Sequence, residues 1–295
     1  MRGTRGDPGE RASELLDEAE ERLRTSEAVE HPHRGKERMD AEELLSFVLD
    51  RPPRARERVP AAEARRFRRL VERRAAGAPA AYLTRRVRFK GMWLAVGPGA
   101  FIPRESSEFM ADQAVRRLAR RPDPAHVDVA TGIGPVALAV ARAIPRARVV
   151  GVDVSRTPVL LARRNARTLG LANARFLQGD LFAPLPPALQ GGVDVVTAHP
   201  PYVPRGEVKD LPGEIRRFEP VESLTDRSPR GMGLVERLAG EAPAWLRPDG
   251  WLLIEVSADR AREVATIMRR AGFREVRSTK DRWAITRVVV GRRPL

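Results

Sequence analysis

Cysteine is absent from the 295-residue sequence, and several classes of protein site are excluded with it. Without thiols the chain has no disulfides, no cysteine-ligated zinc or iron–sulfur cluster and no thiol nucleophile. Histidine is scarce, with four residues at positions 31, 33, 126 and 199, so we expect no metal site. Runs of about 18 apolar residues are also missing, as is an N-terminal apolar segment of the secretory type. We therefore expect a soluble, cytoplasmic protein without a membrane partner.

Lysine is rare too, yet the chain is strongly basic because arginine is abundant. It has 54 Lys plus Arg against 39 Asp plus Glu, a formal net charge of +15. Abundant Arg, Ala and Pro suggest a GC-rich genome as much as a protein that binds polyanions. The net charge of the whole chain therefore does not identify a binding partner. Residues 51–90 alone contribute 14 − 3 = +11. This segment is a candidate contact for nucleic acid, a ribonucleoprotein or an acidic protein, with a solvated helix surface as the alternative.

The N-terminal third of the chain shows three changes of composition. Residues 1–38 are acidic and poor in large apolar side chains, which predicts a mobile, partly helical extension. Apolar residues at three- and four-residue spacing then predict a small helical domain over 39–80. Short apolar runs at Tyr82–Leu83, Val87–Phe89 and Trp93–Val96 predict a β-hairpin linker over 81–104.

Residues 105–295 alternate between apolar runs typical of buried strands and segments with helical periodicity. The expected strands are 126–130, 149–152, 174–177, 193–198, 251–256 and 286–290, and the expected helices are 134–144, 157–169, 233–246 and 259–271. This alternation predicts an α/β fold with a doubly wound, Rossmann-like sheet.

A turn rich in small residues follows the first expected strand. Ala130, Thr131, Gly132, Ile133 and Gly134 lead directly into a helix, where small side chains let a ligand approach the backbone and the helix presents free amides. A tight turn needs glycine for structural reasons as well, so the two glycines alone are weak evidence.

Acidic residues end the next two expected strands. Asp153 follows 19 residues after Gly134, a position from which a carboxylate can accept from both hydroxyls of a ribose, and a helix cap is the alternative. Asp180 could accept from an adenine amino group while Leu181 covers the ring, or it is a surface turn residue. Because Ala137 stands where a dinucleotide motif has its third glycine, the pattern indicates an adenosyl cofactor of another kind.

The fourth expected strand runs into His199, Pro200, Pro201 and Tyr202. Consecutive prolines lack amide donors, which leaves nearby carbonyls free to accept hydrogen bonds from a substrate that bears N–H groups. A plain rigid loop is the alternative. The end of a core strand beside a cofactor turn is the usual place for a ligand crevice.

With this motif the chain resembles the class I S-adenosylmethionine methyltransferases that carry Asn-Pro-Pro-Tyr, and among them the HemK-type (PrmC) protein-glutamine methyltransferases. The resemblance covers roughly residues 40–293. It also includes the Arg-rich segment 73–83, Phe89-Lys90-Gly91, the Ile-Pro-Arg signature within 101–108, Arg217–Pro220 with Ser223-Leu224, and the closing 287–291.

The resemblance implies a seven-stranded, mainly parallel methyltransferase sheet whose last strand pair is mixed in direction, preceded by a helical substrate-recognition domain. It implies that residues 130–134, Asp153, Asp180, Leu181 and His199 bind S-adenosyl-L-methionine. Substrate-binding residues would be Phe101, Pro103, Arg104, 199–202 and Glu219, with His199 and Tyr202 catalytic and no metal. The implied reaction is methylation of the glutamine amide in the Gly-Gly-Gln motif of a peptide-chain release factor.

Two residues depart from the family pattern. Ala130 replaces the usual first glycine of the cofactor turn, and His199 replaces the usual Asn. A neutral imidazole accepts one hydrogen bond, so His199 either still positions an amide, or acts as a base for another amine, guanidine or hydroxyl, or marks a site that only binds.

These departures leave several functions open beside the release factor reaction. The alternatives are an N- or O-methyltransferase of small molecules in specialised metabolism, a catalytically silent cofactor-binding homologue, and a nucleic-acid base methyltransferase in which a flipped base stacks on Tyr202. Glu219 and Glu255 could each line the same cleft, or each could be a surface or helix-capping residue instead.

Overall fold

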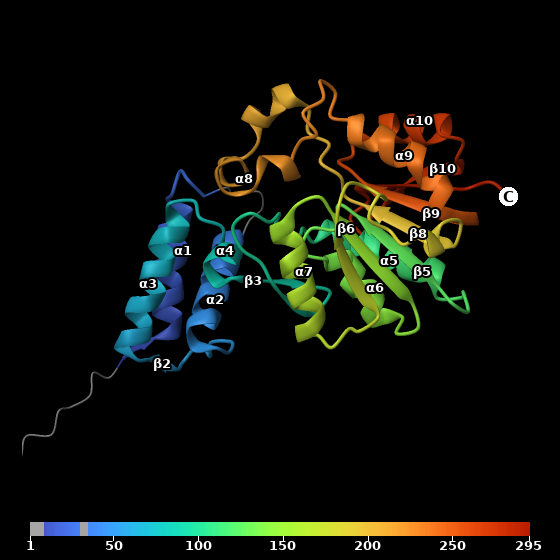
Figure 1. The fold of residues 1–295 in the computed structure, drawn as a ribbon. Helices are drawn as coiled ribbons and strands as arrows, with labels where there is room; N and C mark the ends of the chain where they lie inside the picture. Colours follow the sequence, from blue (N-terminus) through green and yellow to red (C-terminus); the bar gives the residue numbers. More distant parts are fainter. Residues whose placement is uncertain (1–8, 30–34) are drawn as a thin grey trace, which may run out of the picture. The chain divides into compact units, whose positions relative to one another are not determined.

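The computed structural model describes residues 9–29 and 35–295, and these divide into two compact units (Figure 1). The helical unit comprises the chain up to Arg86 together with Asp210–Phe218, and the sheet unit comprises Val87–Lys209 and Glu219–Leu295. The inclusion of 210–218 in the helical unit was not expected from the sequence. His31 and His33 lie outside the described residues.

The helical unit is built on three amphipathic helices. Its elements are β1 (Glu10–Arg11), α1 (Ala12–Arg24), α2 (Lys36–Leu49), β2 (Arg58–Val59), α3 (Ala61–Ala75), α4 (Ala80–Thr84) and α8 (Gly213–Phe218), with β1 and β2 paired antiparallel. Leu15 and Leu23 of α1, Leu44 of α2 and Phe67 of α3 are buried in one core. Burial of such side chains contributes about 1.5–3 kcal/mol each, so this core gives the unit much of its stability.

Two local predictions for this part of the chain are corrected. The mobile extension predicted for 1–38 does not hold for the described residues, because α1 belongs to the core of the helical unit. Alternating charged residues around α1 concealed its apolar stripe. Tyr82 and Leu83 were predicted as a strand and lie in α4, whereas β3 (Arg86–Phe89) and β4 (Met92–Ala95) do pair with each other.

The sheet unit contains a seven-stranded sheet in the order β10-β11-β9-β8-β5-β6-β7. The strands are β5 (Ala125–Val129), β6 (Arg148–Asp153), β7 (Ala174–Gln178), β8 (Val193–Ala198), β9 (Leu246–Glu255), β10 (Arg274–Lys280) and β11 (Thr286–Arg292). The neighbouring strands β7, β6, β5, β8 and β9 pair in parallel, in that order across the sheet. β11 is antiparallel to both of its neighbours, β9 and β10. The predicted doubly wound, mainly parallel seven-stranded sheet is confirmed.

Helices cover both faces of this sheet. The helices are α5 (Ser106–Leu118), α6 (Pro135–Ala143), α7 (Arg156–Thr168), α9 (Gly233–Trp245) and α10 (Ala261–Arg270), with short 3-10 turns at η1 (Pro187–Leu189), η2 (Arg205–Asp210) and η3 (Val221–Ser223). Figure 1 shows α9 and α10 on one face and α5, α6 and α7 on the other. Neither α5 nor the polar edge strand β10 was predicted from the sequence.

The order of the strands determines where a ligand site can form. The chain passes from β5 outward through β6 to β7 and then returns to β8 on the opposite side of β5. In open sheets of this kind the crevice at the carboxyl ends of the two central strands is the general ligand position. Among the described residues, no helix is both long and apolar enough to cross a membrane.

Candidate active site at the carboxyl edge of the sheet

Strand register brings the predicted site residues to one edge of the sheet. Val129 is paired with Val152 of β6 on one side and with Ala198 of β8 on the other, and Ala198 is paired with Ile254 of β9. The residues that follow these positions therefore leave the sheet at the same level. They include Ala130, Asp153, His199 and Glu255.

The turn after β5 has left-handed backbone at three positions, with φ of +53° at Ala130, +55° at Gly132 and +84° at Gly134. A Cβ on Gly134 would lie 2.8 Å from the ring of Phe176, whereas a Cβ on Gly132 would meet no atom within 4 Å. Gly134 therefore allows close packing, and Gly132 leaves open space beside the turn. Thr131 and Ile133 are buried.

Asp153 ties this turn to the end of β6. Its Oδ2 accepts a 2.9 Å hydrogen bond from the Gly132 backbone amide, and its Oδ1 accepts one of 2.9 Å from Ser155. Burial raises the pKa of Asp153, although both backbone bonds oppose that shift. Because each carboxylate oxygen can accept more than one hydrogen bond, the side chain retains capacity for two ligand hydroxyls.

Asp180 and Leu181 follow β7 and differ strongly in exposure. The Asp180 carboxylate is 54% exposed and forms a 2.7 Å ion pair with Arg237 of α9. Leu181 is buried and has a φ of +46°. Asp180 is thus available to solvent and held by a cation, while Leu181 packs into the core.

Asp128 was not identified as a site residue from the sequence. In the structure it contacts both the turn after β5 and the end of β8, the strand that leads into the His-Pro-Pro-Tyr loop. It accepts hydrogen bonds from Thr131 Oγ1 at 2.6 Å and from Thr197 Oγ1 at 2.5 Å. Nε2 of the buried His126 lies 2.8 Å from the same Thr197 hydroxyl. Burial raises the pKa of Asp128 to about 6. An acidic residue inside a fully buried strand was the signal that could have identified it.

Three groups surround the imidazole of His199. Tyr202 stacks on it with ring centroids 5.9 Å apart, and Phe101 approaches it edge-on at 5.6 Å. Nδ1 lies 3.7 Å from Oε2 of Glu255. The ring is held on several sides although 21% of the side chain remains exposed.

The other residues of the loop that carries His199 differ in their surroundings. Burial raises the pKa of the Tyr202 phenol, and the negative charge of Glu255 adds to that effect. Pro200 is buried and Pro201 is partly exposed. The loop therefore presents its aromatic and imidazole groups on a rigid backbone.

The segment before α5 contributes the remaining predicted substrate residues. Arg104 forms an ion pair with the buried Glu219, and its guanidinium lies 4.8 Å from the centre of the Phe101 ring. Phe101 in turn contacts His199, so these residues form one cluster. Pro103 lies in the same partly exposed segment.

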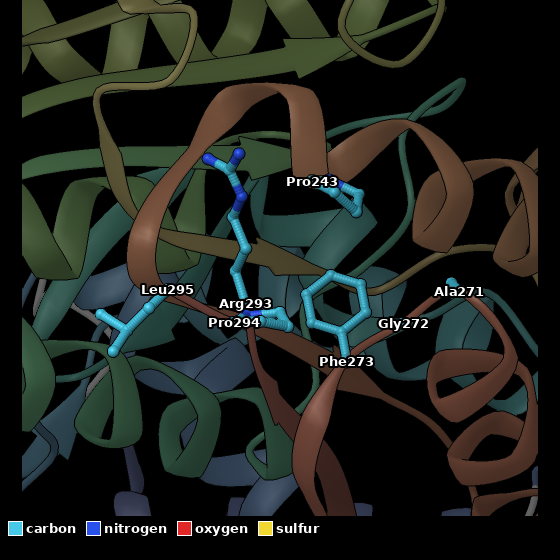
Figure 2. A pocket seen from close by; sticks show the side chains of 7 residues that line it. All are labelled: Pro243, Ala271, Gly272, Phe273, Arg293, Pro294 and Leu295. Atoms are coloured by element: carbon cyan, nitrogen blue, oxygen red, sulfur yellow. The ribbon is translucent and has the colours of Figure 1, made fainter.

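A separate pocket lies at the opposite edge of the sheet (Figure 2). It has a volume of about 290 Å³ and is lined by Pro243, Ala271, Gly272, Phe273, Arg293, Pro294 and Leu295. Pro243 lies near the end of α9, where β9 begins, so this pocket is remote from the carboxyl edge. Across residues 9–29 and 35–295, no cluster of three or more His, Asp or Glu side chains could hold a metal ion.

Comparisons with known proteins match both units of the chain. Residues 14–84 match the model of the PrmC N-terminal domain, and residues 127–218 match a methyltransferase domain model. The release factor glutamine methyltransferase of Bordetella pertussis is 37% identical over 225 residues, covering 76% of this chain and 82% of the relative. The protein of that name from Moorella thermoacetica is 36% identical over 266 residues, covering 88% and 90%.

Solved structures agree on the fold. A 16S rRNA methyltransferase of T. thermophilus, in complex with AdoMet and guanosine, superposes with a TM-score of 0.52 at 18% identity, covering 70% of this chain and 49% of that one. A methyltransferase from Pyrococcus furiosus gives a TM-score of 0.51 at 16% identity, covering 70% and 91%. Identities this low establish the fold alone.

Proposed function

Because the chain belongs to the family of release factor glutamine methyltransferases, we propose that it methylates the glutamine side-chain amide of the Gly-Gly-Gln motif in a peptide-chain release factor. The chain is a methyltransferase by its domain and its family. The observation that carries the proposal is the position of His199–Tyr202, which leave β8 directly beside the turn that follows β5.

The same edge fits S-adenosyl-L-methionine as the methyl donor. The donor would supply an electrophilic methyl group on a sulfonium. The open backbone at Gly132 and the spare acceptor capacity of Asp153 suit its amino-acid and ribose parts. The exposed Asp180 carboxylate and the apolar Leu181 would flank the adenine.

The acceptor amide needs positioning more than activation by a metal or a covalent intermediate. Its nitrogen is a weak nucleophile, so the gain comes from holding it in line with the methyl group. The loop of Pro200 and Pro201 offers carbonyls without competing amide donors, and His199 offers one imidazole acceptor. Phe101 and Tyr202, which contact His199, would exclude water from the glutamine.

The helical unit would bind the protein substrate or a ribonucleoprotein. Arg65, Arg69 and Arg73 are exposed on α3 at four-residue spacing, and no ion pair neutralises them within the described part of the chain. Like charges at this spacing destabilise a helix slightly, which an acidic partner surface would offset. Replacing the three by Glu should raise the KM for the release factor at low salt with little change in kcat. Matched changes at the exposed Arg116 of α5 and at the exposed Arg120, two residues after that helix, should leave KM unaltered.

The proposal is tested by methyl transfer from labelled S-adenosyl-L-methionine to a purified release factor and to its Gln→Ala variant at Gly-Gly-Gln. Label that depends on the glutamine supports the assignment. Label that is independent of it, or appears only on a small amine or a nucleic acid, points to one of the alternative acceptors. Cofactor binding without turnover of any acceptor would indicate a silent homologue.

A further inference from the structure

Glu255 ends β9 with one of its two carboxylate oxygens satisfied and the other not. The side chain is 3% exposed. Oε1 accepts a 2.8 Å hydrogen bond from Ser106 Oγ at the start of α5. Oε2 is buried and has no hydrogen-bond partner among the described residues.

A buried carboxylate oxygen without a donor is costly, so the group nearest to Oε2 is informative. That group is Nδ1 of His199 at 3.7 Å. A movement of about 0.8 Å would bring the pair to the length of a charge-assisted hydrogen bond. Strand pairing supports the juxtaposition, because Ala198 and Ile254 are register partners and the two residues follow them.

Within residues 9–29 and 35–295, the other nitrogen of His199, Nε2, has no hydrogen-bond partner. Phe101 lies at the edge of the ring and Tyr202 stacks on its face, and neither supplies a hydrogen bond to Nε2. If Nδ1 carries the proton that Oε2 needs, Nε2 must be the acceptor in a neutral imidazole.

We propose that Glu255 is a positioning residue that fixes His199 as the Nδ1–H tautomer, with Nε2 facing the methyl acceptor. This inference rests on the proposed function. It places a His–Glu pair at the position where the family pattern has Asn.

In the reaction, the acceptor amide nitrogen forms a bond to the methyl carbon while the carbon–sulfur bond breaks and its electron pair stays on sulfur. The nitrogen then carries one hydrogen too many. Nε2 of His199 takes that proton, and the resulting imidazolium is stabilised by the Glu255 carboxylate. The products are a secondary amide, a neutral thioether and one proton held by the pair.

The first test observes the tautomer directly in the full-length protein without substrate. Ring ¹⁵N shifts of labelled histidine at about pH 8.5, where ordinary imidazole is neutral, report which nitrogen is protonated, and His199→Asn assigns the signal among the four histidines. The native protein should show predominantly Nδ1–H, and Glu255→Gln should lower the ratio of Nδ1–H to Nε2–H by about tenfold or more. A native His199 that is mainly Nε2–H overturns the proposal.

The second test is kinetic and uses a double-mutant cycle. Glu255→Gln should lower kcat about 100-fold with little change in the KM for the release factor. In the His199→Asn background the same change should cost less than about threefold, and Glu236→Gln, at an exposed ion pair, controls for the substitution itself. An equal loss in both backgrounds means a structural role and overturns the proposal. If no release factor is methylated, the proposed function fails while the tautomer measurement still decides the role of Glu255.

Discussion

Arg74 of α3 and Glu214 of α8 form a 2.7 Å ion pair across 140 residues of sequence. The Arg74 side chain is 1% exposed, and its Nε also donates a 2.7 Å hydrogen bond to Asp40. Lys36 lies within 3.6 Å of Glu214 and completes the cluster. The pair attaches the segment that follows the His-Pro-Pro-Tyr loop to the helical unit.

Removing Arg74 should destabilise the helical unit strongly, because the largely buried Asp40 and Glu214 would then share the more distant Lys36 in place of the guanidinium that contacts both. We expect Arg74→Met to cost about 3 kcal/mol, equivalent to about 100-fold faster amide exchange in peptides from α2, α3 and 210–218. Arg22→Met, which breaks an ion pair with Glu72 that is exposed on both sides, should cost less than about 1 kcal/mol. Equal effects of the two changes would contradict a special role for the buried cluster.

Asp128 should make the sheet unit less stable as pH rises. Its pKa is about 6 in the folded protein against 3.8 for an ordinary aspartate. Folding thus favours the protonated form, and the stability that this provides is present at low pH and lost as pH rises through about 6. The native protein should lose about 2 kcal/mol between pH 4 and pH 7 relative to Asp128→Asn.

Fluorescence-detected urea unfolding measures this difference, because all four tryptophans lie in the sheet unit. The comparison with Asp128→Asn is needed since His126, whose pKa burial lowers to about 3, contributes the opposite slope in both proteins. A pH-independent difference between native and Asp128→Asn would refute the assignment.

Ala130→Gly should stabilise the sheet unit slightly. Alanine at a φ of +53° pays a steric penalty of roughly 1–2 kcal/mol that glycine avoids, while glycine loses more conformational entropy on folding. We expect a net gain of up to about 1 kcal/mol. Ala137→Gly, in the interior of α6, should instead lose about 1 kcal/mol. Loss of stability in both variants would show that Ala130 is not strained.

Asp153→Asn should weaken binding of S-adenosyl-L-methionine about 10- to 100-fold, because the ribose hydroxyls lose a charged acceptor. Titration calorimetry measures the affinity without any acceptor substrate. The control is Asp194→Asn at the amino end of β8, where a buried carboxylate accepts from the Ala125 backbone amide. The same loss of affinity in both variants would indicate a general effect on the fold.

The sequence predicted the central sheet well and the peripheral elements poorly. Val193–Ala198 is wholly buried and apolar except for Asp194 and Thr197, so its period and length identified β8 with its bounds. β10 is mostly exposed and polar, and its pairing with β11 comes from tertiary contacts that no local pattern records. The packing of α1 into a core was missed for a related reason, since its buried leucines are interspersed with acidic residues.

In the candidate site, too, local motifs were predicted from the sequence, whereas contacts between residues far apart in the sequence were not. The small-residue turn at 130–134 and the His199–Tyr202 loop are contiguous and were recognised as motifs. The contact between His199 and Glu255 joins two strands through a parallel register, and the pair of Arg104 with Glu219 spans 115 residues. Such pairings depend on strand order and loop path, which single-sequence patterns do not contain.

Mass spectrometry of the release factor peptide that contains Gly-Gly-Gln, after incubation with this protein and S-adenosyl-L-methionine, detects the proposed methylation itself. We expect one added methyl group, located by fragmentation on the glutamine side chain, and no addition when that glutamine is replaced by alanine. An unmodified glutamine after incubation with folded, cofactor-binding protein, or a methyl group on another residue of the release factor, would contradict the proposed function.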